Sequence, residues 1–162
     1  MENVSYFDCN ASFGAPAAGV YRPCLTADDL LAEMDWVGVD QALVHHALMR
    51  DQSPVVGNAV LAESIVGRPR LVGSWAILPP QTGELPPAQE FFAAMARANI
   101  RALWAFPEDH RYILDRITFG RFLGEVGERR IPLFIPRDAV GPRPQDMWNL
   151  VYHLLGQYPS LT

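Results

Sequence analysis

The hydrophobic residues of this chain fall into short runs separated by longer segments of helical periodicity. Each run has the length of a buried β-strand and ends at glycine, proline or a polar residue. The first run spans Val4 to Phe7, and the next four begin near residues 41, 71, 101 and 131. A strand therefore recurs roughly every thirty residues, the spacing of βα units in a parallel sheet.

Helix signals fill the intervals between the strands. Thr26 is a predicted N-cap with Asp29 three residues later, and Ser53 is a cap followed at once by Pro54. We predict helices over residues 27–37, from 54 to near 67, and over 87–98, 119–128 and 145–157. The same spacing places a sixth strand near residue 161.

Two architectures fit this order of elements. Five βα units match the first part of a (β/α)8 TIM barrel, whose complete form needs about 250 residues. A five-stranded doubly wound sheet is the alternative, and it could be complete at this length. No glycine-rich phosphate-binding sequence follows the first strand, which disfavours its nucleotide-binding form. We expect an α/β fold of parallel βα repeats, an incomplete barrel, in a single domain over residues 1–162.

Composition and charge narrow the expected partners. The 162 residues carry a net charge of −5, which argues against a nucleic-acid-binding surface. There is no apolar stretch of transmembrane length and no signal-peptide pattern, so we expect a cytoplasmic protein without a membrane partner. The two cysteines do not indicate a disulfide framework. All 13 basic residues are arginine, which excludes mechanisms that need a lysine.

The first strand ends in a polar stretch, Asp8–Gly14. Asn10 and Ser12 are two residues apart, so on a regular strand they project to the same side, and Asp8 would join them. They could hydrogen-bond a bound carboxylate or carbonyl, or satisfy backbone groups of the loop. Asn10 and Ser12 are therefore candidate substrate-binding residues, with Asp8 as the ionised group beside them.

Short motifs along nearly the whole chain match those of a known family. They are Phe7-Asp8-x-Asn10-x-Ser12-x-Gly14, Leu30 to Val44, Gly57-Asn58, Arg68 to Gly73, Ile100 to Leu103, Tyr112-x-Leu114-Asp115, Ile131 to Ile135 and Tyr158 to Thr162. In these motifs the chain resembles the N-terminal part of the amidohydrolase-related metal-dependent hydrolases. These are (β/α)8 barrels that include hydrolases and decarboxylases, so the resemblance implies the first five units of such a barrel.

The resemblance also implies a divalent metal of the zinc type, but the expected ligands are replaced. The family's first strand ends in His-x-His, where this chain has Asn10-x-Ser12. Its fifth strand ends in a histidine, where Pro136 stands. Asparagine and serine are poor zinc ligands beside imidazole. We therefore assign no metal ligand and no cofactor to this chain.

His45 and His46 end the second strand, at the rim where barrel active sites lie. Adjacent strand residues point to opposite faces, so at most one of the two faces inward. A histidine of this pair, or Asp8, is the candidate general base. The alternative is that one histidine packs in the core and the other is solvated, without a catalytic role. Arg137 follows the fifth strand and could offer its guanidinium to an anionic substrate, or pair with Asp138 at the surface.

Two functions remain open. The first is an amidohydrolase-type hydrolase, or a fragment of one, acting on a small carboxylate, amide or lactone substrate with a degenerate metal site. The second is a catalytically inactive binding or assembly module of the same fold. Such a module would close its barrel against a second copy, a partner or a missing C-terminal half. Both rest on analogy at the level of the fold.

Overall fold

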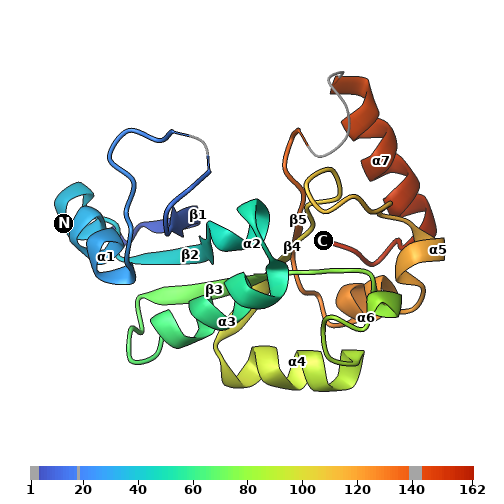
Figure 1. Cartoon of the computed structure of the whole chain (residues 1–162), viewed down its shortest axis with the longest axis horizontal. Coiled ribbons are helices and arrows are strands. Elements are labelled where there is room, and N and C mark those ends of the chain that lie inside the picture. Colours follow the sequence, from blue (N-terminus) through green and yellow to red (C-terminus); the bar gives the residue numbers. More distant parts are fainter. Residues whose placement is uncertain (1–3, 18, 139–143) are drawn as a thin grey trace.

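A computed structural model describes residues 4–17, 19–138 and 144–162. Five strands lie within these residues: β1 Phe7–Phe13, β2 Gln41–His46, β3 Leu71–Ala76, β4 Ile100–Trp104 and β5 Leu133–Phe134. All neighbouring pairs are parallel, and the sheet follows the sequential order β1-β2-β3-β4-β5 with the curl of a partial barrel (Figure 1). A doubly wound sheet instead reverses its strand order at a switch point. The predicted incomplete barrel is confirmed, and the doubly wound alternative is wrong.

Helices connect the strands as the sequence predicts. They are α1 Ala27–Val37, α2 Leu48–Asp51, α3 Pro54–Ser64, the 3-10 turn η1 Pro80–Thr82, α4 Ala88–Arg97, α5 Arg116–Phe119, α6 Phe122–Glu128 and α7 Pro144–Gln157. Thr26 and Asp29 form the predicted capping box, each side chain accepting a hydrogen bond from the other's backbone N–H. Ser53 caps α3 with Pro54 in its first turn. Among the described helices, none has the length and apolar character needed to cross a bilayer.

Several segments differ from their predicted extents. β1 covers Phe7–Phe13, so the polar stretch after Phe7 belongs to the strand, whereas the apolar run that predicted the strand is Val4 to Phe7. The short helix α2 has no counterpart among the predicted helices. The helix predicted over residues 119–128 is split into α5 and α6, and Gly120 lies at the break with a φ of 52°. That left-handed conformation suits glycine and cannot continue a helix. The strand predicted over residues 131–136 is reduced to β5, because Pro132 and Pro136 flank it and have no N–H to contribute to the ladder.

The main core lies between the sheet and the helices α3, α4 and α6. Gly73 of β3 has no side chain, and Leu61, Ile65 and Ile100 fill the space that a Cβ would occupy. Trp75 packs against Phe91 of α4 with ring centroids 5.4 Å apart, and aromatic contacts continue through α6. This face of the sheet is called here the helix-covered face, and the opposite face is called the inner face.

A buried amide fixes the end of β3. The side chain of Asn58, on α3, donates to the carbonyl of Ala76 at 2.9 Å and accepts the N–H of Ala76 at 2.8 Å. Both groups are buried, so each of these hydrogen bonds satisfies polar atoms that would otherwise have no partner. The pair holds α3 against the sheet at the carboxyl end of β3. The loops that follow the carboxyl ends of the strands are called the rim below.

The outer edge of β5 meets the C-terminal residues. The N–H of Leu133 donates to the carbonyl of Thr162 at 2.9 Å. Residues 158–162 form a turn and an extended end, and no strand is assigned there within the described residues. At the position expected for a sixth strand, the C-terminal residues therefore form one backbone hydrogen bond with β5 within the described residues.

Candidate functional site

The inner face of the sheet gathers polar and aromatic side chains near the carboxyl ends of the strands. Ser12 is the register partner of His45 across β1 and β2, and Trp104 is the partner of Phe134 across β4 and β5. Register partners in parallel strands point to the same side. The rings of His45 and Trp104 lie 5.1 Å apart, which brings the two pairs together on one surface. Trp104 also stacks on Phe134 at 5.0 Å.

His45 is a titratable group on this inner face. Burial lowers the pKa of His45 to about 4, and a hydrogen bond with the backbone of Ala11 only partly opposes that shift. The imidazole is therefore neutral at pH 7. In a neutral ring one nitrogen carries a proton and the other a lone pair, so His45 can accept a proton or a hydrogen bond.

His46 lies on the other side of β2, on the helix-covered face. It is 7 % exposed, packs edge-on against Phe13 with centroids 5.1 Å apart, and its Nδ1 accepts the N–H of Leu48 at 3.2 Å. Burial lowers the pKa of His46 as well. The structure thus separates the two histidines: His45 faces the inner surface and His46 packs beneath the turn into α2.

An irregularity in β1 changes which of its residues face inward. Asp8 pairs with Ala42, whereas Ala11 pairs with Val44, so three residues of β1 span two residues of β2. Ser12 consequently points to the opposite face from Asp8, and the expectation that the two share one face is wrong. The carboxylate of Asp8 accepts the N–H of Asn10 at 2.9 Å, and both residues are exposed.

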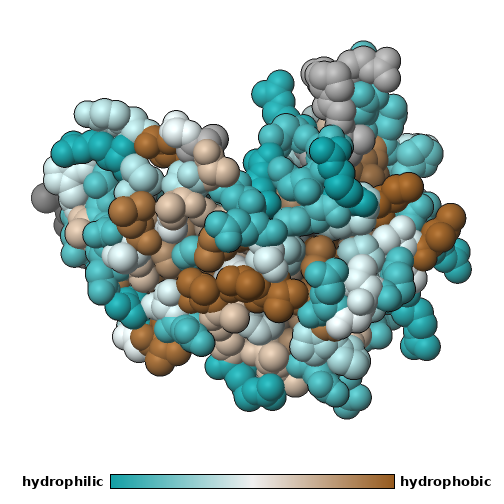
Figure 2. All heavy atoms as spheres, viewed as in Figure 1, coloured by the Kyte–Doolittle hydropathy of each residue, from teal (hydrophilic) through white to brown (hydrophobic). Residues whose placement is uncertain are grey.

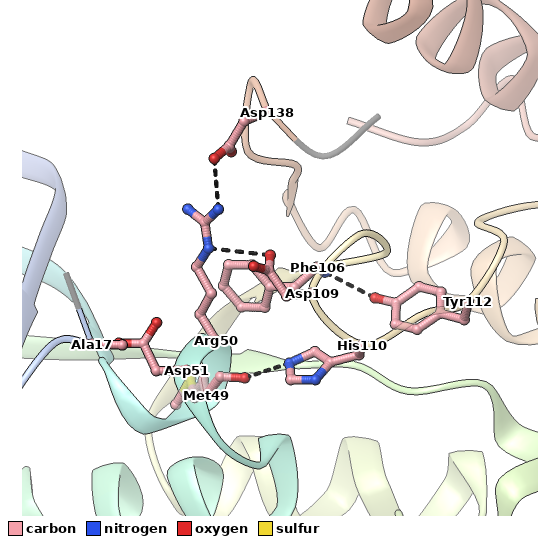
Figure 3. A network of polar contacts seen from close by, with 9 residues as sticks. All are labelled: Ala17, Met49, Arg50, Asp51, Phe106, Asp109, His110, Tyr112 and Asp138. Atoms are coloured by element: carbon pink, nitrogen blue, oxygen red, sulfur yellow. Dashed lines mark hydrogen bonds and ion pairs between the residues drawn. The ribbon is translucent and has the colours of Figure 1, made fainter. Parts of the chain in front are cut away.

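A network centred on α2 joins the loops at the carboxyl ends of the strands (Figure 3). Arg50 donates through Nε to Asp109 at 3.1 Å and through Nη2 to Asp138 at 2.6 Å. The neighbouring Asp51 accepts the N–H of Ala17 at 2.7 Å. One short helix after β2 therefore holds the loops that follow β1, β4 and β5. The space-filling view shows this rim as largely hydrophilic, with a hollow between the loop after β1 and the loops after β4 and β5 (Figure 1 and Figure 2).

Two further residues tie the loop after β4 to the rim. Nε2 of His110 lies 2.8 Å from the carbonyl of Met49 on α2. The hydroxyl of Tyr112 accepts the N–H of Phe106 at 2.9 Å and lies 3.3 Å from the carbonyl of Ile77, just past β3. Burial raises the pKa of Tyr112, so the phenol keeps its proton. With these contacts, the loops after all five strands are linked.

The loop after β5 places Arg137 and Asp138 differently from the expected surface pair. Asp138 binds Arg50, and the hydrogen bond from Arg50 lowers the pKa of Asp138. Arg137 is exposed, and in the part of the chain that the structure describes it has no ion pair. The alternative in which these two residues pair with each other is wrong. The exposed guanidinium of Arg137 can therefore bind an anion.

Replacing Arg50 with methionine is expected to lower the free energy of unfolding by about 1 kcal/mol, because two partly exposed ion pairs are lost together. Amide hydrogen exchange should quicken around Asp109 and Asp138, where the loops lose their common partner. The matched control is Arg111→Met, which removes only the exposed pair with Glu108. Equal effects of the two substitutions on stability and exchange would contradict this role of Arg50.

The residues at the expected metal-ligand positions do not fit zinc. Asn10 and Ser12 are exposed on β1, and Pro136, just past β5, offers no side-chain donor. In residues 4–17, 19–138 and 144–162, no three His, Cys, Asp or Glu side chains are grouped so that they could hold a metal ion. No chemical step of this site is therefore assigned to a metal.

Comparisons with known proteins leave the family unassigned. The resemblance to amidohydrolase-related enzymes stays a prediction from the sequence motifs, and the geometry of the inner face and the rim is the basis for a function. A scan against protein-family models finds no match, and a search of curated proteins finds no significant relative.

Proposed function

We propose that this chain is an amidohydrolase-type hydrolase, or part of one, acting on a small carboxylate-, amide- or lactone-type substrate. The observation that carries the proposal is the juxtaposition of Ser12 and His45 on the inner face, at the carboxyl ends of neighbouring parallel strands. This is the edge at which barrels of this kind position their reactive groups. The rim network around Arg50 gives that edge a defined shape.

His45 is the proposed general base, because its neutral imidazole holds a lone pair at pH 7, although burial lowers its basicity. It takes a proton from a water molecule as the water oxygen bonds to the acyl carbon. The Ser12 hydroxyl and the Asn10 amide donate hydrogen bonds to the carbonyl oxygen, on which negative charge develops. The protonated His45 then returns its proton to the leaving amine or alcohol as the acyl bond breaks. Arg137 offers an exposed guanidinium to a substrate carboxylate.

A second candidate function is a catalytically inactive binding or assembly module. The specific observation in its favour is that the described residues hold no group suited to a metal ion, where the family resemblance implies one. Such a module would keep the rim and the inner face for binding and lack turnover.

The test is hydrolysis of a panel of small esters, lactones and amides that carry a carboxylate. His45→Gln is expected to lower the rate by about 100-fold or more, a typical loss on removing a general base. The wild-type rate should be flat near neutral pH and fall as the pH drops through about 4, where His45 becomes protonated. His153→Gln, on the exposed surface of α7, is the matched control and should leave the rate unchanged.

The outcomes separate the two candidates. Turnover that survives His45→Gln would reject the assigned base. Wild-type protein that binds a panel member, as shown by a raised melting temperature, and never hydrolyses any would favour the binding module. Neither binding nor turnover across the panel would reject both functions for this face.

A further inference from the structure

Three arginines surround a hollow at the amino-terminal ends of the strands, the end opposite to the rim. Arg101 is the second residue of β4, and Arg129 and Arg130 lie between α6 and β5. They line one hollow of about 300 Å³, whose other walls are Phe92, Met95, Ala96, Ile100 and Ile131. The walls of the hollow therefore combine apolar side chains with three arginines.

The positive charge of this hollow is only partly balanced, because one of its three arginines has a carboxylate partner among the described residues. Within the described residues Arg101 and Arg130 form no ion pair, and Arg129 approaches only Glu125, at 3.9 Å. Glu128 lines a different hollow, which Arg116 and Arg121 also border. The hollow thus carries a local excess of positive charge, whereas the net charge of the whole chain is −5.

Helix-end electrostatics account for Arg129 and Arg130, which end α6, and leave Arg101 unexplained. Arg129 caps the C-terminus of α6, where the helix dipole favours a cation, and its guanidinium lies 4.5 Å from the ring centroid of Phe92. Arg101 is on a strand. Arg130 has a φ of 53°, unusual for a residue with a side chain, and its N–H is held by the carbonyl of Gly127 at 2.9 Å. The backbone therefore fixes Arg130 beside the hollow.

We propose that this hollow binds a phosphate group. Guanidinium groups present planar, paired donors that match phosphate oxygens, and arginine keeps its charge at every physiological pH. A volume of about 300 Å³ is at the lower end for ligand pockets and accommodates one or two phosphates. The site lies at the opposite end of the strands from Ser12 and His45, so it is independent of the proposed hydrolysis.

The test is calorimetric titration and thermal unfolding with inorganic pyrophosphate, at an ionic strength held constant with sodium chloride. Wild-type protein is expected to bind with one site and to gain melting temperature. The double variant Arg101→Gln, Arg130→Asn should weaken binding by about tenfold or more, since it removes two charge-assisted contacts. Asparagine is chosen at position 130 because it tolerates a positive φ. The matched control is Arg116→Gln, Arg121→Gln at the neighbouring hollow, which should leave binding unchanged.

Vesicles of phosphatidylglycerol form a second arm, which separates a soluble phosphate from a lipid headgroup. Pyrophosphate binding without vesicle binding assigns the site to a soluble ligand, and vesicle binding alone assigns it to a lipid surface. A melting-temperature gain no larger than that with sodium chloride in the first arm, without vesicle binding in the second, would overturn the proposal. Binding retained in a folded double variant would overturn it equally.

Discussion

Replacing Gly57 with alanine is expected to lower the free energy of unfolding by about 2–3 kcal/mol, because the new methyl group has no room. Gly57 is buried on α3, where a Cβ would lie 2.5 Å from the backbone nitrogen of Met49 and 2.7 Å from its Cα. Backbone atoms cannot swing aside as the tip of a long side chain can. The substitution therefore pushes α2 away from α3 and moves Arg50 off the loops that it joins.

Urea-induced unfolding measures this effect, and Gly124→Ala is its matched control. Gly124 is also a helical glycine, on α6, but nothing lies within 4 Å of the position of its Cβ. Alanine there should raise stability by about 0.5–1 kcal/mol, because it removes the backbone entropy of glycine from a helix. If both substitutions change stability in the same direction, the close approach of α2 to Gly57 is not what limits that position.

Acid is expected to destabilise the protein through His45 by about 3 kcal/mol. Its pKa is about 4 in the folded chain against 6.5 for the unperturbed group, and each pKa unit corresponds to about 1.4 kcal/mol. Because the folded pKa is the lower one, the unfolded chain takes up the proton first. The contribution of neutral His45 is therefore fully present above pH 6.5 and is lost as the pH falls toward about 4.

Other groups titrate in the same range, so the measurement is a difference between two proteins. Urea unfolding of wild type and of His45→Gln is compared at about pH 7.5 and about pH 4.5. Wild type should lose more stability on acidification than the variant, because glutamine has no proton to gain. Parallel losses in the two proteins would show that His45 is solvated in the folded chain and not desolvated as its burial indicates.

Local signals in the sequence are sufficient to predict the repeating βα units of the fold. The cap at Thr26 and the stop at Gly38 define α1, and β2 has the predicted bounds of residues 41–46. Hydrophobic periodicity alone did not reveal that Gly120 breaks a helix, because the apolar stripe continues across the break. Nor does periodicity reveal the irregularity in β1, because a strictly alternating strand would place Asp8 and Ser12 on one face.

Only part of the candidate site can be predicted from the sequence. Placing Ser12 and His45 at neighbouring strand ends needs only the order of the βα units. Predicting the network of Arg50, Asp109 and Asp138 requires the paths of three loops. Arg50 lies 59 and 88 positions from its two partners in the sequence, and such distant pairs leave no periodic pattern. Their one common feature is that each follows closely after a strand, the position from which side chains reach the rim.

The sequential strand order also has a consequence for how the chain folds during synthesis. Each strand after β1 in the described part of the chain pairs with the strand immediately before it, so none of these pairings waits for a distant segment. A ribosome that adds about 5–20 residues per second releases one βα unit in about 2–6 s, ample time for a small unit to dock on the unit before it. The sheet can thus grow in the direction of translation, with its newest strand as the growing edge.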